Sequence, residues 1–269
     1  MKTVLPDTGF ERTIQAHRTV LTNEMARHFR DTRPELQQLG QLGKRVALEE
    51  ATARMKGKFA RIKNLFDNQR AIYEEIKRIL DESGTKEILD IFSGLALVPL
   101  ALLASKKLQK TYLLDSHTKI NYRAIAQELY VRRDQIEHVQ TMIHPFSSEI
   151  SLPPTKQVTL IDTGLSLPGE ARAPNVNIDY EVAQSSHLPH EPRLRTEDDH
   201  LAVVLKLLQG KERNVLIIDR PHLKTAKDVI ESSRNRIETV MAATRGDWQV
   251  DVHEQIQEKN LIVTRLTKV

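Results

Sequence analysis

Three acidic residues stand at the ends of short apolar segments. Asp90 ends "KEILD", Asp115 ends "TYLLD" and Asp162 ends "VTLID". Each segment has the length and apolar character of a buried β-strand. Because open α/β folds bind ligands at the carboxyl ends of their strands, acids at these positions are candidates for contact with a polar ligand.

The residues after Asp90 indicate what kind of ligand this would be. The stretch "DIFSGLA" (90–96) places Phe92, Ser93, Gly94 and Ala96 between an apolar strand and an apolar helix. Small residues let backbone N–H groups approach a ligand closely, and the start of the following helix offers a positive dipole end. At the end of the next strand, an acid such as Asp115 can accept hydrogen bonds from both hydroxyls of a ribose.

The residue pattern from Lys86 onward predicts the elements that carry these acids. Short β-type segments alternate with helical stretches, which implies right-handed βαβ units and a mostly parallel sheet. The last segment, "WQVDVHEQIQEKNLIVTRLTK", contains two strands whose short connection permits only an antiparallel hairpin. The sequence therefore predicts an α/β fold with a Rossmann-like sheet closed by a C-terminal hairpin.

A helical region precedes this sheet. Residues 10–82 carry apolar residues at helical spacing, with breaks expected near Thr32–Pro34 and around Gly40–Gly43. We expect an N-terminal helical domain over residues 1–84 and a sheet domain over residues 85–269. The helical domain could recognise a substrate, cover the site or form a homodimer contact.

The "DIFSGLA" motif and the acid one βαβ unit later resemble class I S-adenosylmethionine-dependent methyltransferases. Their first motif runs acid-x-(Gly/Phe)-x-Gly-x-(Gly/Ala), and their sheet ends in an antiparallel hairpin. The resemblance implies that Asp90 lies near the methionine amino group, that Asp115 holds the ribose and that the residues after the third strand lie beside the adenine. The cofactor-binding residues implied or singled out at the strand ends are Asp90, Phe92, Ser93, Gly94, Ala96, Asp115, Ser116, Met142, Ile143, His144 and Asp162.

Two departures from the family pattern stand out. Ala96 takes the place of the usual last glycine, and the third strand ends in "TMIHP", which offers no acid for the adenine amino group. These departures leave open a catalytically inactive relative that keeps the fold as an interaction module. Aminocarboxypropyl transfer from the same cofactor is a further alternative.

The region after the fourth strand bears on the methyl acceptor. "IDTGLS" lacks the Asn/Asp-Pro-Pro-aromatic signature of enzymes that methylate exocyclic amines in nucleic acids. The insert 164–196 holds four prolines and no periodic pattern. We expect it to be a lid that covers the site and encloses a small-molecule substrate. No catalytic residue is singled out. The candidate bases are His144, Asp162, His187, His190 and His222.

The distribution of charge along the chain supports RNA as an alternative substrate. The net charge of +4 resides in residues 1–85, and "RMKGKFARIK" (54–63) carries five cations and no acid. Such a segment is either a solvated helix face or a contact for RNA phosphates through Arg54, Lys56, Lys58, Arg61 and Lys63. The N-terminal helices followed by "EILDIFSGLALVPLALL" also resemble, more weakly, the 16S ribosomal RNA guanine-N7 methyltransferases of aminoglycoside resistance.

The amino-acid composition excludes several other classes of protein. With 39% hydrophobic and 28% charged residues, the 269-residue chain has a globular composition, and its longest apolar stretch is too short for a membrane span. The chain has no cysteine, which excludes a thiolate nucleophile or a thiolate metal site. We expect a cytoplasmic protein without a membrane partner and without a metal.

Overall fold

The computed structural model describes residues 8–61, 63–91, 95–115, 120–140, 159–162, 214–219, 248–253 and 262–268. The helices among them are α1 (Thr8–Thr32), α2 (Pro34–Gln38), α3 (Gly40–Arg61), α4 (Lys63–Ser83), α5 (Leu97–Ala104) and α6 (Tyr122–Glu128), with a 3-10 turn η1 (Arg133–Gln135). The strands among them are β1 (Glu87–Ile91), β2 (Lys110–Asp115), β3 (Ile136–Gln140), β4 (Thr159–Asp162), β5 (Asn214–Asp219), β6 (Trp248–His253) and β7 (Ile262–Lys268).

These strands form one sheet in the order β3-β2-β1-β4-β5-β7-β6. Strands β1 to β5 pair with one another in parallel, whereas β7 pairs antiparallel with both β5 and β6. The predicted α/β Rossmann-like sheet is therefore confirmed. The connection between β6 and β7, residues 254–261, lies outside the described residues.

The strand order changes direction at β1. From β1 the chain adds β2 and β3 on one side, and it then returns to place β4 and β5 on the other. Such a reversal leaves a crevice at the carboxyl ends of the two strands that flank it, because their connections depart to opposite sides of the sheet. The crevice expected here lies between β1 and β4.

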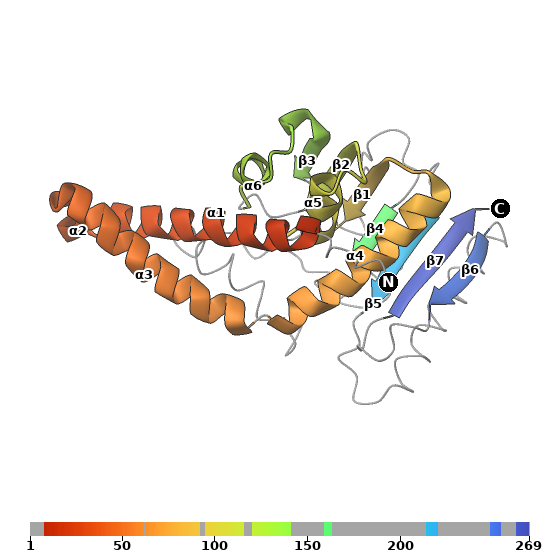
Figure 1. Ribbon diagram of the computed structural model, residues 1–269, viewed down its shortest axis with the longest axis horizontal. Helices are drawn as coiled ribbons and strands as arrows, with labels where there is room; N and C mark the ends of the chain where they lie inside the picture. The colour runs from red at the N-terminus through yellow and green to blue at the C-terminus, as the bar shows by residue number, and fades with distance from the viewer. Residues whose placement is uncertain are drawn as a thin grey trace, which may run out of the picture.

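Helices α1 and α3 lie side by side and extend away from the sheet as a long arm, with α2 at its tip (Figure 1). At this tip Arg33, which precedes α2, donates hydrogen bonds from both terminal guanidinium nitrogens to the Glu50 carboxylate, at 2.6 and 3.0 Å. The guanidinium of Arg33 also lies over the ring of Phe29, 4.7 Å from its centroid. These contacts hold the end of α1 against α3.

The sequence predicted the helical region and its first breaks correctly. α1 ends at Thr32 and α2 begins at Pro34, while α3 begins at Gly40. A further change of direction was not predicted. α4 leaves the arm and turns back toward the sheet after α3 ends (Figure 1), with only residue 62 between them.

The hydrophobic core continues from the arm into the sheet region. One cluster of buried side chains includes Phe10 and Met25 of α1, Ala51 of α3, Leu100 of α5 and Ile125 of α6. α1 packs against α3 in the arm and against α5 and α6 beside the sheet. The boundary at residue 84 stays a prediction, and the helices on either side of it share this core.

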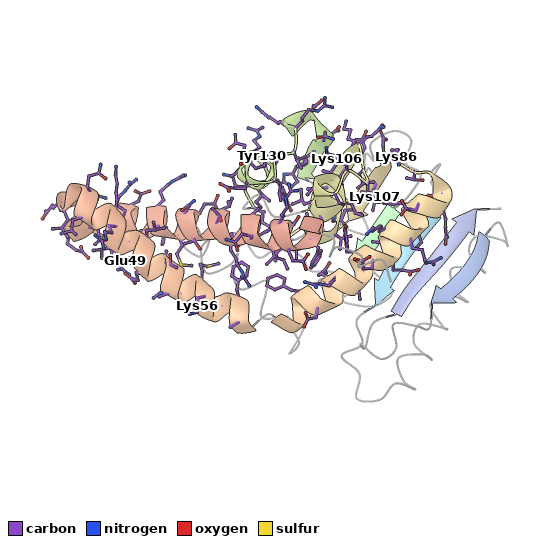
Figure 2. All side chains as sticks on the ribbon, viewed as in Figure 1. Glu49, Lys56, Lys86, Lys106, Lys107 and Tyr130 are labelled. Atoms are coloured by element: carbon purple, nitrogen blue, oxygen red, sulfur yellow. The ribbon has the colours of Figure 1, made fainter. Side chains whose placement is uncertain are left out.

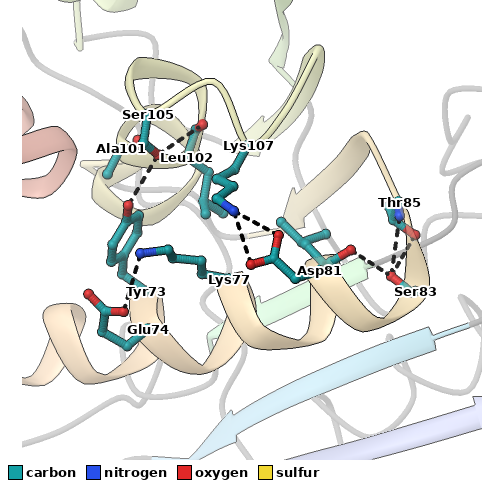
Figure 3. Close-up of polar contacts among 11 residues, drawn as sticks. Tyr73, Glu74, Lys77, Asp81, Ser83, Thr85, Ala101, Leu102, Ser105 and Lys107 are labelled. Atoms are coloured by element: carbon teal, nitrogen blue, oxygen red, sulfur yellow. Dashed lines mark hydrogen bonds and ion pairs between the residues drawn. The ribbon is translucent and has the colours of Figure 1, made fainter. Parts of the chain in front are cut away.

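Polar contacts join α4 to the end of α5 (Figure 3). The hydroxyl of Tyr73 donates to Ser105 Oγ at 3.1 Å, and Ser105 Oγ donates to the carbonyl of Ala101 at 2.8 Å. Close by, Lys107 Nζ lies 2.8 and 3.0 Å from the two carboxylate oxygens of Asp81. These contacts fix α5, whose first residues follow the candidate site.

Among the described helices, none combines the length and the apolar character that crossing a membrane requires.

Candidate functional site

The register of the sheet places the three strand-end acids on three adjacent strands. Asp90 is aligned with Leu113 of β2 and with Leu160 of β4. Asp115 and Asp162 are the last residues of β2 and β4, and each lies two positions beyond the residue aligned with Asp90. The acids therefore occupy the carboxyl edge of the sheet, on both sides of the reversal at β1.

Asp90 is almost fully buried, with 3% of its surface exposed. It follows Ile88 and Leu89, which are both completely buried. Burying a carboxyl group carries a desolvation penalty that hydrogen bonds or charges have to offset. Asp90 is also on β1, the strand at which the strand order reverses.

Ala96 connects the segment after β1 to α5. It precedes the first helical residue, it is buried, and its backbone is left-handed, with φ 48° and ψ 35°. This conformation favours glycine because a Cβ crowds the backbone there. Ala96 is thus an alanine in a backbone conformation that glycine adopts more readily.

His17 of α1 reaches the same segment. Its side chain is completely buried, and Nε2 lies 2.6 Å from the carbonyl oxygen of Leu95. The other ring nitrogen, Nδ1, lies 2.8 Å from the carbonyl oxygen of Thr13, one turn earlier in α1. Burial lowers the pKa of His17, while the two carbonyl contacts oppose this shift. Sequence analysis did not single out His17.

Glu24 makes a second contact from α1 to the sheet region. Asn121, which precedes α6, donates a side-chain hydrogen bond to Glu24 and accepts one from the Ala124 N–H at 3.1 Å. Partial burial raises the pKa of Glu24, and the Asn121 hydrogen bond and the charge of Arg27 oppose the rise. Since Asn121 follows the end of β2, α1 contacts the chain after both β1 and β2.

Most of the predicted site residues lie outside the described residues. Of the predicted residues, only Asp90 and Ala96 have both backbone and side chain described, and Asp115 and Asp162 are placed by their strands. Those outside the description are Phe92, Ser93, Gly94, Ser116, Met142, Ile143, His144, the candidate bases His187, His190 and His222, and the insert 164–196. Within the described part of the chain, no group of three or more histidine and acidic side chains could hold a metal ion.

The basic segment of α3 lies on the arm. Arg54 and Lys56 are exposed, and Figure 2 shows Lys56 on α3 well away from the sheet. Arg54 lies over the ring of Phe29 at 5.2 Å, and Arg18 of α1 lies over the ring of Phe59 at 5.1 Å. Lys58 is half-buried, and the side chains of Arg61 and Lys63 lie outside the description.

No family model matches the chain, and no curated protein matches its sequence. Solved structures do resemble its fold. Magnesium protoporphyrin IX methyltransferase (ChlM) from Synechocystis PCC 6803 with bound SAM is 12% identical, over 77% of this chain and 83% of that chain, with a TM-score of 0.49. The methyltransferase domain of bacterial CtHen1 is 12% identical, over 75% of this chain and 98% of that chain, with a TM-score of 0.48.

The pyocyanin biosynthetic protein PhzM is 13% identical, over 87% of this chain and 60% of that chain, with a TM-score of 0.45. All three TM-scores are 0.49 or lower. The likeness concerns the fold and assigns no activity to this chain.

Proposed function

We propose that this protein is an S-adenosylmethionine-dependent methyltransferase that acts on a small molecule. One observation carries the proposal: three strand-end acids lie on the three adjacent strands that flank the reversal of strand order. In open α/β sheets this edge is where ligands bind. The "DIFSGLA" sequence after β1 and the antiparallel β7 fit the class I methyltransferase pattern.

The chemical character of the edge suits this cofactor. The cofactor carries an amino group and two ribose hydroxyls, which are hydrogen-bond donors, and aspartate carboxylates are acceptors. We assign Asp90 to the methionine amino group and Asp115 to the ribose. Gly94 and Ala96 belong to the segment expected to approach the cofactor closely, and Met142, Ile143 and His144 are assigned to the adenine.

Methyl transfer from this cofactor requires few catalytic groups from the protein. The bound cofactor supplies a methyl group on a positively charged sulfonium, for in-line transfer to a nucleophilic atom of the substrate. The chain's task is to orient the two reactants, to exclude water and to receive a proton where the acceptor loses one. We assign the enclosure of the substrate to the N-terminal helices and to residues 164–196, and Asp162 lies next to the start of that segment.

Calorimetric titration with S-adenosylhomocysteine tests the proposal directly. We expect one site per chain, with S-adenosylmethionine competing for it. Titration with ATP under the same conditions is the control, because a general nucleotide site would bind both. Binding of ATP alone, or of neither ligand, would contradict the proposed function.

The basic segment of α3 supports a second candidate, an RNA methyltransferase. Residues 51–61 contain four cations and no acid, and Arg18 of α1 lies over Phe59 of the same segment. Binding that depends on phosphate contacts weakens steeply as salt rises. Fluorescence anisotropy with a structured RNA would show this dependence, and the double change Arg54→Gln, Lys56→Gln should reduce its slope. RNA binding without any loss in the double variant would remove this candidate.

A further inference from the structure

His17 is a buried polar residue that links two segments far apart in the sequence. It lies on α1, and Leu95, whose carbonyl it contacts at 2.6 Å, lies 78 residues later, between β1 and α5. The His17 side chain has no exposed surface. A buried histidine at hydrogen-bond distance from a distant carbonyl fixes the position of that carbonyl relative to its own helix.

The Leu95 carbonyl lies just before the hydrogen-bond ladder of α5. That ladder begins one residue later, where the Ala96 carbonyl accepts the N–H of Leu100 at 3.1 Å. Because Leu95 precedes the N-cap residue Ala96, the helix itself offers no N–H to its carbonyl. His17 Nε2 stands where it can act as the donor.

We propose that His17 is a positioning residue that holds Leu95 and Ala96 in place for cofactor binding, by donating a hydrogen bond from Nε2–H to the Leu95 carbonyl. This inference rests on the proposed function. His17 acts through Leu95, at the end of the segment that begins at Asp90. Fixing that carbonyl keeps the left-handed Ala96 and the start of α5 in the geometry that the bound cofactor requires.

A second contact from the same helix supports this role. Glu24 lies seven residues after His17, which is two turns of helix, and it accepts a hydrogen bond from Asn121 after β2. Arg12, near the start of α1, donates to the carbonyl of Leu129 at the end of α6, at 3.0 Å. α1 thus contacts the chain after β1 and β2, the two strands that carry Asp90 and Asp115.

The position of the single proton on a neutral His17 follows from the two acceptors. Thr13 lies four residues before His17, so its carbonyl is already the acceptor of the His17 backbone N–H in α1. The Leu95 carbonyl lies outside the ladder of α5, and its distance to the ring is the shorter of the two. We therefore expect the Nε2–H tautomer.

Calorimetric titration with S-adenosylhomocysteine of wild type, His17→Phe and His17→Gln tests the inference. Phenylalanine fills the space without a donor and should weaken binding about 5- to 10-fold, the effect of one lost hydrogen bond. Glutamine offers an amide donor at a similar reach and should recover most of the affinity. Thr13→Val is the matched control, because Thr13 is equally buried on α1 but its hydroxyl donates within the helix to Gly9.

The outcomes separate the two proposals. If the wild type does not bind, the proposed function fails and the inference fails with it. If the wild type binds and His17→Phe binds equally well, or if His17→Gln loses as much as His17→Phe, the inference alone is overturned. Long-range ¹⁵N–¹H correlation spectra of the histidine rings report the tautomer without any variant: Nε2–H supports the inference, and a neutral Nδ1–H ring contradicts it.

Discussion

Gly43 and Leu36 are in direct backbone contact at the tip of the arm. A Cβ added to Gly43 would overlap the carbonyl group of Leu36, so glycine at this position allows α3 to lie against α2. Gly57, further along α3, has no neighbouring atom within 4 Å of the place where its Cβ would be. Close packing therefore requires a glycine at position 43, whereas position 57 has room for a side chain.

Gly43→Ala should destabilise the protein and Gly57→Ala should stabilise it. The first change forces α2 and α3 apart, at a cost of about 1–3 kcal/mol. The second replaces an exposed helical glycine by the best helix former, which contributes about 0.5–1 kcal/mol. Urea denaturation of the two variants measures both effects, and equal stabilities would show that α2 does not pack on α3 through Gly43.

The stability of the protein should carry a pH dependence from His17. Because burial lowers the pKa of His17 below its usual 6.5, the unfolded chain takes up a proton before the folded one does as the pH falls. The His17 contribution is therefore complete above pH 6.5 and is lost as the pH falls through that value, by at most about 1.4 kcal/mol per pH unit.

Comparison with His17→Gln isolates this contribution, because glutamine keeps a donor and does not titrate. Urea denaturation at several pH values between about 7.5 and 5 should show the wild type losing stability relative to the variant. If the wild type instead gains relative stability as the pH falls, the folded protein holds His17 as the imidazolium, and the assignment of a neutral ring is wrong.

Glu24→Gln should stabilise the protein at neutral pH. Burial raises the pKa of Glu24 above its ordinary value, so the ionised form that prevails near pH 7 is disfavoured in the folded state. Glutamine can still accept the hydrogen bond from Asn121 without that penalty. The gain should shrink as the pH falls toward about 4, where the wild-type carboxyl takes up its proton.

Glu49→Gln is the control for this change. Glu49 is an exposed acid on α3 that pairs with Arg45 one turn away, and its neutralisation should leave stability almost unchanged or slightly lower. Thermal unfolding at about pH 7 and about pH 4 distinguishes the two. A melting temperature of Glu24→Gln below that of the wild type at neutral pH would contradict the account of Glu24.

The sheet and the placement of its acids were predictable because their signals are local. "KEILD", "TYLLD" and "VTLID" are short apolar segments that end in an acid, and β1, β2 and β4 include the residues Asp90, Asp115 and Asp162. The ligand-binding roles of the acids stay predictions.

The contribution of α1 was not predictable because it depends on contacts between distant segments. Helical spacing identified the first helix but could not tell which elements would cover its buried face. His17 resembles any other polar residue on that helix until Leu95 is brought to it.

Binding of S-adenosylhomocysteine to Asp115→Ala, measured by calorimetry, tests the central claim most directly. Losing a charged acceptor of both ribose hydroxyls should weaken binding about 10- to 100-fold. Asp134→Ala removes the same charge from an exposed side chain in η1, and it should bind like the wild type. Equal affinity of Asp115→Ala and wild type, or no binding by the wild type, would contradict a cofactor site at the carboxyl edge of β2.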